Sequence, residues 1–195
     1  MLAAVILSGG ASSRMGSPKA LLPYQGRPFL EHLLEVTALP EIGVRRVVLG
    51  AHAEPIAKAI HLKADEIVIN PDWEKGQLSS IQAAMRSLPP GTDGFLLCLI
   101  DHPLISAALI EELIERFYKS GKLIVLPIYE GRRGHPVIFS AKLYDELLRA
   151  PLETGARAVV WAHAGDIELV STNEEGCVLN LNDPETLNQA IPPIR

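Results

Sequence analysis

The feature that most constrains the fold is an alternation of short apolar runs with amphipathic segments along the first two thirds of the chain. Five apolar runs have the length of strands, at residues 2–7, 45–50, 65–70, 94–100 and 122–128. Four segments between them carry apolar residues at helical spacing, at residues 28–39, 54–62, 76–88 and 106–120. This alternation predicts an α/β fold, a Rossmann-like three-layer sandwich whose mostly parallel sheet is covered by helices on both faces.

Beyond residue 128 the elements become shorter. The sequence predicts a hairpin-like turn at 129–134, then a strand, two helices, two strands and a closing helix, at residues 135–139, 141–150, 155–164, 167–172, 176–181 and 183–191. Ser106 is the expected N-cap of the 106–120 helix, and Asp183 caps the closing helix. We expect a single domain over residues 1–195, in which residues 129–195 elaborate the first part rather than fold separately.

Charge and hydropathy exclude two kinds of partner. The net charge of −5 argues against a broad interface with the phosphate backbone of nucleic acid. No apolar stretch reaches the ~18–20 residues that span a membrane, and the opening MLAAVIL lacks the basic start of a signal peptide. We therefore expect a cytoplasmic protein. Cys98 and Cys177 form no CxxC pair, so we expect two buried thiols rather than a zinc site.

Ligands of open α/β sheets bind beyond the carboxyl ends of strands, so the residues after each apolar run are candidates for a site. The stretch LSGGASSRMGSPKALLP, residues 7–23, follows the first run. Its glycines let backbone N–H groups approach anionic oxygens. The Arg14 guanidinium can donate two parallel hydrogen bonds to a phosphate, and the Lys19 ammonium group can bind it as a point charge. It matches neither GxxxxGK[ST], because Ala20 follows Lys19, nor GxGxxG. It predicts a phosphate-binding loop, with a solvated surface loop as the alternative.

A longer stretch, LSGGASSRMGSPKALLPYQGRPFL, resembles the signature LAGGxSxRMGxxKxLLPxxGxPL of the MobA-like NTP transferases, which include the molybdenum cofactor cytidylyl- and guanylyltransferases. Further segments resemble other family motifs in the same order: NPDWEKGQLSSIQAAM, LIDHPLI, GRRGHPVIF, TGARAVV and LNLNDPETL. Together they cover nearly the whole chain. The resemblance implies the nucleotide-diphospho-sugar transferase type of fold, with residues 1–128 on the nucleotide side and 129–195 on the acceptor side.

The resemblance also implies roles for single residues. Arg14 would bind the β- and γ-phosphates that leave as pyrophosphate, Lys19 would stabilise charge on the α-phosphate, and Asp101 completes the catalytic set. The nucleotide-binding residues that it implies are Leu7, Ser8, Gly9, Gly10, Ser12, Arg14, Lys19, Asn70, Gly76, Ser80 and Asp101.

A metal site is expected at Asp101, which ends the apolar run FLLCLI. From the residues alone, a carboxylate that caps the following turn is the alternative. The family resemblance implies that Asp101 holds Mg²⁺ on the nucleotide, a cation that needs only one or two protein carboxylates. Asn182 is the expected second ligand, although the family often has Asp there and an amide oxygen brings no charge.

The acceptor side contains no Ser/His/Asp or Cys/His arrangement. None is needed if the acceptor is a phosphate monoester, whose second pKa of about 6 leaves it largely dianionic at neutral pH. The resemblance implies a molybdopterin-type acceptor near GRRGHPV, so Arg133, His135 and Arg157 are candidate acceptor-binding residues. The alternatives are a polar histidine without a catalytic role and, for Arg157, a position on a helix surface. A molybdoenzyme or its chaperone is the expected downstream partner.

The nucleotide is predicted from conflicting motifs. LSGG is typical of the guanylyl branch, whereas NPDWEKGQLSS, RRGHPV and TGAR are closer to the cytidylyl branch, so CTP is favoured over GTP. A sugar- or alditol-phosphate nucleotidylyltransferase is a further alternative. A non-catalytic nucleotide-binding or cofactor-delivery protein is the alternative from another class, suggested by Asn182 at the metal site. The retained Arg14, Lys19 and Asp101 argue against it.

Overall fold

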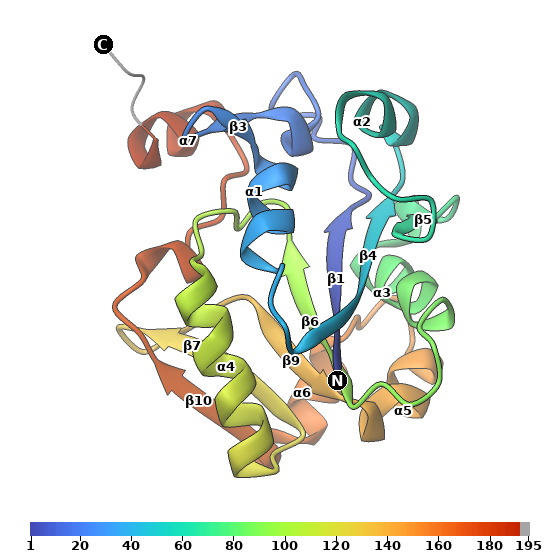
Figure 1. Cartoon of the computed structure of the whole chain (residues 1–195), viewed down its shortest axis with the longest axis vertical. Helices are drawn as coiled ribbons and strands as arrows, with labels where there is room; N and C mark the ends of the chain where they lie inside the picture. Colours follow the sequence, from blue (N-terminus) through green and yellow to red (C-terminus); the bar gives the residue numbers. More distant parts are fainter. Residues whose placement is uncertain (192–195) are drawn as a thin grey trace.

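The computed structural model describes residues 1–191 and contains an eight-stranded mixed sheet in the order β10-β7-β9-β6-β1-β4-β5, with β8 paired to β7 (Figure 1). Parallel pairs join β1 to β4 and β6, β4 to β5, and β7 to β10, whereas β9 is antiparallel to β6 and β7. The strands are β1 (Leu2–Ser8), β4 (Ile42–Leu49), β5 (Ile67–Ile69), β6 (Gly94–Leu99), β7 (Ile124–Tyr129), β8 (Arg132–Arg133), β9 (Val137–Ser140) and β10 (Ile167–Ser171). The predicted α/β class is confirmed.

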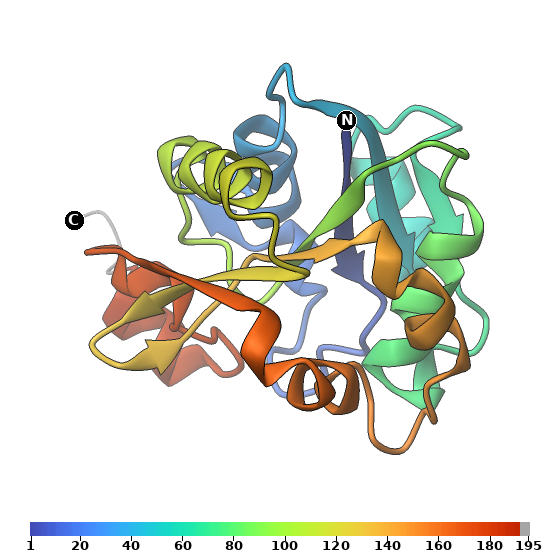
Figure 2. The ribbon, with the colours of Figure 1, turned by 90° about the horizontal axis from the view of Figure 1, so that it is seen from below.

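Helices cover both faces of this sheet, as Figure 2 shows. The α-helices are α1 (Phe29–Val36), α2 (Ala53–Ala59), α3 (Gln77–Arg86), α4 (Ala107–Ser120), α5 (Tyr144–Arg149), α6 (Arg157–Ala162) and α7 (Pro184–Ala190). Short 3-10 helices are η1 (Lys19–Leu21), η2 (Trp73–Lys75), η3 (Ala141–Leu143), η4 (Ala164–Asp166) and η5 (Glu175–Cys177). A separate hairpin joins β2 (Pro23–Tyr24) to β3 (Arg27–Pro28).

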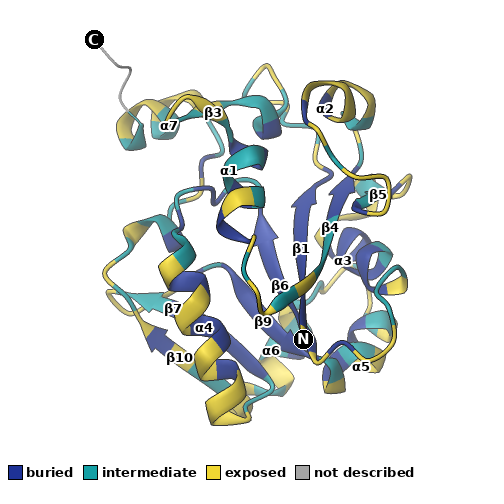
Figure 3. Ribbon diagram, viewed as in Figure 1, coloured by how far each residue is buried: buried dark blue, intermediate teal, exposed yellow. Residues whose placement is uncertain are grey.

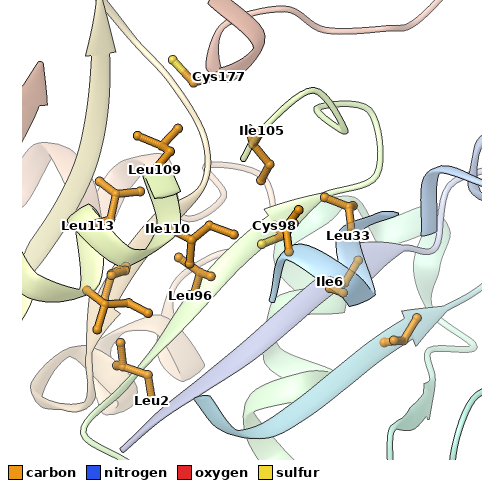
Figure 4. Packing of buried hydrophobic residues seen from close by; sticks show 14 of the residues in the cluster. Leu2, Ile6, Leu33, Leu96, Cys98, Ile105, Leu109, Ile110, Leu113 and Cys177 are labelled. Atoms are coloured by element: carbon orange, nitrogen blue, oxygen red, sulfur yellow. The ribbon is translucent and has the colours of Figure 1, made fainter. Parts of the chain in front are cut away.

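The core consists of two apolar clusters, one on each face of the sheet. Strands β1 and β6 are buried along their whole length, as expected for central strands covered on both sides (Figure 3). Side chains alternate along β1, so Ile6 belongs to the cluster that includes α1, α2 and α4, whereas Val5 belongs to the cluster that includes α3, α5 and α6. Figure 4 shows the first cluster, with Cys98 close to Leu33. Cys98 and Cys177 are both free and fully buried, as predicted.

Both predicted N-caps are present. The Ser106 Oγ accepts a hydrogen bond from the Leu109 N–H (3.1 Å), and the Asp183 carboxylate accepts one from the Thr186 N–H (2.9 Å). Pro184 occupies the first turn of α7. A side chain that satisfies an otherwise unpaired N–H explains why these helices begin where the sequence predicts.

The strand predicted at residues 176–181 is wrong. The chain forms η5 there and pairs with no strand among the described residues. Gly176 packs so closely on the loop after β6 that a Cβ would lie 1.7 Å from the Leu104 carbonyl oxygen. The Leu181 N–H donates to the Asp101 carbonyl (2.8 Å). The apolar run is therefore buried against a loop rather than within the sheet, which sequence periodicity cannot distinguish.

Within the described part of the chain, no helix is long and apolar enough to cross a membrane.

Candidate functional site

The candidate site is a cavity of about 400 Å³ at the carboxyl ends of the central strands. The parallel register aligns Leu7 with Val48 of β4 and with Leu99 of β6, so the loops after these three strands emerge at one edge of the sheet. In Figure 1 their arrowheads point toward the end of the molecule that carries α2 and α7. Ten of the residues predicted to bind nucleotide line this cavity: Leu7, Ser8, Gly9, Gly10, Ser12, Arg14, Lys19, Gly76, Ser80 and Asp101.

The loop after β1 is held in place by the segment after β4 and by a hydrogen bond between its own two ends. The Gly9 carbonyl accepts from the Ala51 N–H (3.1 Å), and a ring nitrogen of His52 lies 2.7 Å from the Ala11 carbonyl. The Ser12 Oγ accepts from the Lys19 N–H (3.2 Å) and so closes the loop at the first residue of η1. This contact positions the Lys19 side chain at the cavity.

The Lys19 ammonium group lies between two oxygen acceptors. Its ammonium group donates to Asn182 Oδ1 and is 3.9 Å from Asp101 Oδ2. The Leu181 N–H bond to the Asp101 carbonyl brings the segment before α7 to this position. Burial lowers the pKa of Lys19, the Asp101 carboxylate opposes that shift, and the nearby Arg14 guanidinium adds to it. The cavity therefore combines two cations with a carboxylate and an amide oxygen.

The donor set fits a hard divalent cation. Asp101 and Asn182 already converge on one positive charge, the Lys19 ammonium group. Among residues 1–191, no group of three or more His, Cys, Asp or Glu side chains is arranged to hold a metal ion. An ion at Asp101 and Asn182 would therefore depend on oxygens from its ligand and from water, which is how Mg²⁺ binds beside phosphates.

Asn70 differs from the other predicted nucleotide-binding residues, because it is buried behind the cavity wall. The residue is only 3% exposed and is not among the described residues that line the cavity. It contacts Ser79 and Ser80 instead. The sequence places Asn70 correctly at the end of a strand, but strand position alone does not show whether a side chain touches a ligand or supports a neighbour.

The predicted acceptor-binding residues do not line this cavity in the described structure. His135 precedes β9, and β9 pairs antiparallel with β6. The centroid of the His135 ring is 5.0 Å from that of the His102 ring. Burial lowers the pKa of His135 to about 4, and the Nδ1 atoms of both histidines are buried without a hydrogen-bond partner in residues 1–191. Arg133 is exposed in β8. The structure therefore brings His135 next to the residue that follows Asp101.

Arg157 lies outside the cavity, on a helix. It begins α6, on the face of the sheet that α3 and α5 also cover, and its guanidinium carbon is 5.8 Å from the centroid of a Trp161 ring. This position is the helix surface that the sequence left open as the alternative. A role of Arg157 in acceptor binding remains a prediction.

Several residues of the cavity wall were not predicted. His52, Trp73, Glu74 and Gln77 line it from the segments after β4 and β5. Trp73 packs on Gly50, where an added Cβ would lie 2.7 Å from the Trp73 Cβ. The signal that identifies these residues is their position directly after apolar runs whose carboxyl ends meet at one edge of the sheet.

Comparisons with known proteins agree with this architecture. A model of the MobA-like NTP transferase domain matches residues 4–167. The molybdenum cofactor guanylyltransferase of Rhizobium meliloti is 32% identical over 200 residues, which cover 96% of this chain and 89% of that protein. Nicotine blue oxidoreductase of Paenarthrobacter nicotinovorans is 29% identical over 180 residues, covering 88% and 87%. The crystal structure of Rv0371c from Mycobacterium tuberculosis H37Rv has a TM-score of 0.83 at 25% identity, covering 98% and 97%.

Proposed function

The chain belongs to the MobA-like NTP transferase family, and from this premise we propose that it transfers a nucleotidyl group from a nucleoside triphosphate to the phosphate of a molybdopterin-type acceptor. The observation that carries the proposal is the cavity in which Arg14 and Lys19 meet Asp101 and Asn182. Two cations beside two hard oxygen donors suit a triphosphate bound with a divalent ion.

The proposed reaction is an in-line displacement at the α-phosphorus. An oxygen of the acceptor phosphate forms the new bond, the bond from the α-phosphorus to the bridging oxygen breaks, and pyrophosphate leaves with its electron pair. Arg14 binds the β- and γ-phosphates, and Lys19 moves from Asn182 to the α-phosphate and stabilises its charge. Asp101 and Asn182 would hold Mg²⁺, which would supply further neutralisation of charge on the phosphate oxygens.

For the nucleotide, we propose CTP in preference to GTP. NPDWEKGQLSS, RRGHPV and TGAR support CTP, whereas LSGG and the similarity to the guanylyltransferase of Rhizobium meliloti support GTP. For the acceptor, we propose Arg133 and His135: His135 lies beside His102, the residue that follows Asp101, and Arg133 is exposed on β8, which pairs with β7. A molybdoenzyme or its chaperone would then receive the product.

The test is pyrophosphate release by the purified protein with molybdopterin, Mg²⁺ and each of CTP, GTP, ATP and UTP in turn. We expect release with one nucleotide, dependent on both acceptor and Mg²⁺, and strongly reduced in Asp101→Asn. Replacement of molybdopterin by sugar or alditol phosphates tests the alternative acceptors. Tight nucleotide binding without pyrophosphate release from any acceptor would overturn the proposal in favour of a non-catalytic nucleotide-binding or delivery protein.

The similarity to nicotine blue oxidoreductase favours a second candidate function, a redox reaction. The same loop is suited to the diphosphate of a dinucleotide, because its glycines and Arg14 recognise phosphate rather than a particular base. Oxidation of NADH or NADPH by the protein, measured with a heteroaromatic dye as electron acceptor, tests it. Turnover there without pyrophosphate release would replace the transferase proposal.

A further inference from the structure

The segment that leads into α7, residues 174–182, runs alongside residues 101–106 of the loop after β6, in the opposite direction. We call residues 174–182 the strap. Each of these two segments carries one of the residues that would hold the divalent ion: Asp101 begins the loop, and Asn182 ends the strap. The contacts between strap and loop therefore set how these two oxygen ligands face each other.

Hydrogen bonds fasten both ends of the strap to the loop. At one end, the Glu174 carboxylate accepts from the Ser106 N–H (3.0 Å) and from the Ser106 hydroxyl. At the other end, the Leu181 N–H donates to the Asp101 carbonyl (2.8 Å). Hydrogen bonds to a charged acceptor are roughly twice as strong as neutral ones, so Glu174 is the stronger of the two anchors.

Close packing holds the middle of the strap. Gly176 lies so near the loop that an added Cβ would be 1.7 Å from the Leu104 carbonyl oxygen, so no other residue fits there without a shift of the backbone. Ile105 and Cys177 belong to the same apolar cluster (Figure 4). A ring nitrogen of His32 in α1 is 3.1 Å from the Ile105 carbonyl, which holds the loop independently of the strap. A displaced strap would therefore move Asn182 relative to Asp101.

The chemistry of Asn182 makes its placement decisive. Its Oδ1 accepts from the Lys19 ammonium group, which lies 3.9 Å from Asp101 Oδ2. An amide oxygen carries no net charge, so it does not attract a cation over a distance as the Asp101 carboxylate does. Mg²⁺ also requires near-ideal octahedral geometry, with ligands at about 2.1 Å. A small displacement of the strap would therefore cost the ion its amide ligand first.

We propose that Glu174 and Gly176 are positioning residues of the divalent-ion site. They keep the strap on the loop, so that Asn182 stays where it and Asp101 can bind one ion together. Neither residue lines the cavity in the described structure, so both act through Asn182. This inference rests on the proposed function, because it requires a nucleoside triphosphate and a divalent ion in the cavity.

Two substitutions loosen the strap in different ways. Glu174→Gln leaves one acceptor oxygen for the two Ser106 donors and places an N–H₂ group where the other oxygen was. Gly176→Ala puts a methyl group against the Leu104 carbonyl, and because the φ of Gly176 is not positive, its effect is steric alone.

Each substitution has a matched control in the chain. Glu175→Gln makes the same change at the next residue, which is exposed. Gly165→Ala adds a methyl group in η4, where an added Cβ would have no neighbour within 4 Å and φ is again not positive. Both controls lie outside the cavity wall in the described structure.

The experiment measures the dissociation constants of CTP and GTP with excess Mn²⁺ and with EDTA, well below the lowest melting temperature of the set. The ratio of the EDTA value to the Mn²⁺ value is the gain in affinity due to the metal. For the nucleotide that wild type binds more tightly, we expect Glu174→Gln and Gly176→Ala to lower this ratio about tenfold. The EDTA values and both controls should match wild type.

Pyrophosphate release provides a second readout that a general loss of stability would not change in the same way. In both strap variants, the Mn²⁺ concentration for half-maximal release should rise about tenfold, while kcat recovers when Mn²⁺ saturates. If Gly176→Ala does not fold, the comparison of Glu174→Gln with Glu175→Gln decides the matter.

The possible failures are distinguishable. Wild type that binds neither nucleotide with Mn²⁺ would overturn the proposed function and this inference together. Wild type that binds and transfers a nucleotide, with the metal gain unchanged in both strap variants, would overturn the inference alone. Equal weakening with Mn²⁺ and with EDTA would also overturn it, because the strap would then support the cavity as a whole rather than the ion.

Discussion

At the scale of single residues, Lys19 has the most specific expected role. Its ammonium group is largely buried between Asn182 and Asp101, and in the proposed reaction it meets charge that develops on the α-phosphate. Lys19→Ala should therefore lower the turnover rate by a factor on the order of 10²–10³ and weaken nucleotide binding much less. Parallel measurement of kcat and of the nucleotide dissociation constant checks this, and equal losses in both would contradict a transition-state role.

His135 makes a pH-dependent contribution to stability. Burial lowers its pKa from the usual 6.5 to about 4, so between those values the unfolded chain binds a proton that the folded protein does not. The free energy of unfolding should therefore fall as the pH decreases from 6.5 toward 4, by up to about 1.4 kcal/mol per pH unit. Urea unfolding of wild type and His135→Gln across this range measures it, and identical pH slopes would contradict the assignment.

The sequence predicts chemistry at single positions better than it predicts contact with a ligand. A role at a ligand site could be predicted for Gly9, Arg14, Lys19 and Asp101 because these residues follow buried strands. A fold seldom requires a glycine or a charged residue in the segment after a buried strand. Asn70 has the same position in the chain but is turned into a hydrogen-bond network, because its amide is satisfied by Asp72, Ser79 and Ser80. That difference depends on the path of the chain from β5 into α3, which no local pattern encodes.

At the scale of elements, the N-cap of α4 is the clearest local determinant of stability. The Ser106 Oγ accepts from the Leu109 N–H and also donates to the Glu174 carboxylate. Ser106→Ala should lower the free energy of unfolding by about 1–2 kcal/mol and the melting temperature by roughly 2–4 °C for each kcal/mol. Glu112→Ala, on the exposed face of α4, is the control and should change stability by less than about 0.5 kcal/mol. Equal effects of both would contradict the capping role.

The elements that sequence periodicity predicts correctly are those packed on the sheet. β1, β6 and α4 carry continuous or helically spaced apolar residues, because one or both of their faces are buried. Residues 176–181 carry a similar apolar run but pack against the loop after β6, as the Leu181 bond to Asp101 shows. The strand prediction failed because an apolar run indicates that a segment is buried, but does not indicate that it pairs with a strand.

At the scale of the whole molecule, the position of β9 links the two parts of the chain. β9 belongs to residues 129–195 but lies between β6 and β7 of the first part, so neither part completes the sheet alone. Unfolding should therefore be a single cooperative transition. Each part of the chain contains one tryptophan, Trp73 in the first and Trp161 in the second. The fluorescence of Trp161→Phe therefore monitors unfolding of the first part, and that of Trp73→Phe monitors unfolding of the second. Coincident fluorescence midpoints are expected, and separate midpoints would contradict a single domain.

The central claim is that the cavity at the strand ends binds a nucleoside triphosphate with a divalent ion. The most direct measurement is the melting temperature of the wild-type protein with CTP, GTP, ATP and UTP, each with and without Mg²⁺. A nucleotide at about 100 times its dissociation constant adds roughly 2.7 kcal/mol, or about 5–10 °C for a chain of this size. We predict a shift of this size for one nucleotide, dependent on Mg²⁺ and reduced in Asp101→Asn. No shift with any of the four nucleotides would contradict the account.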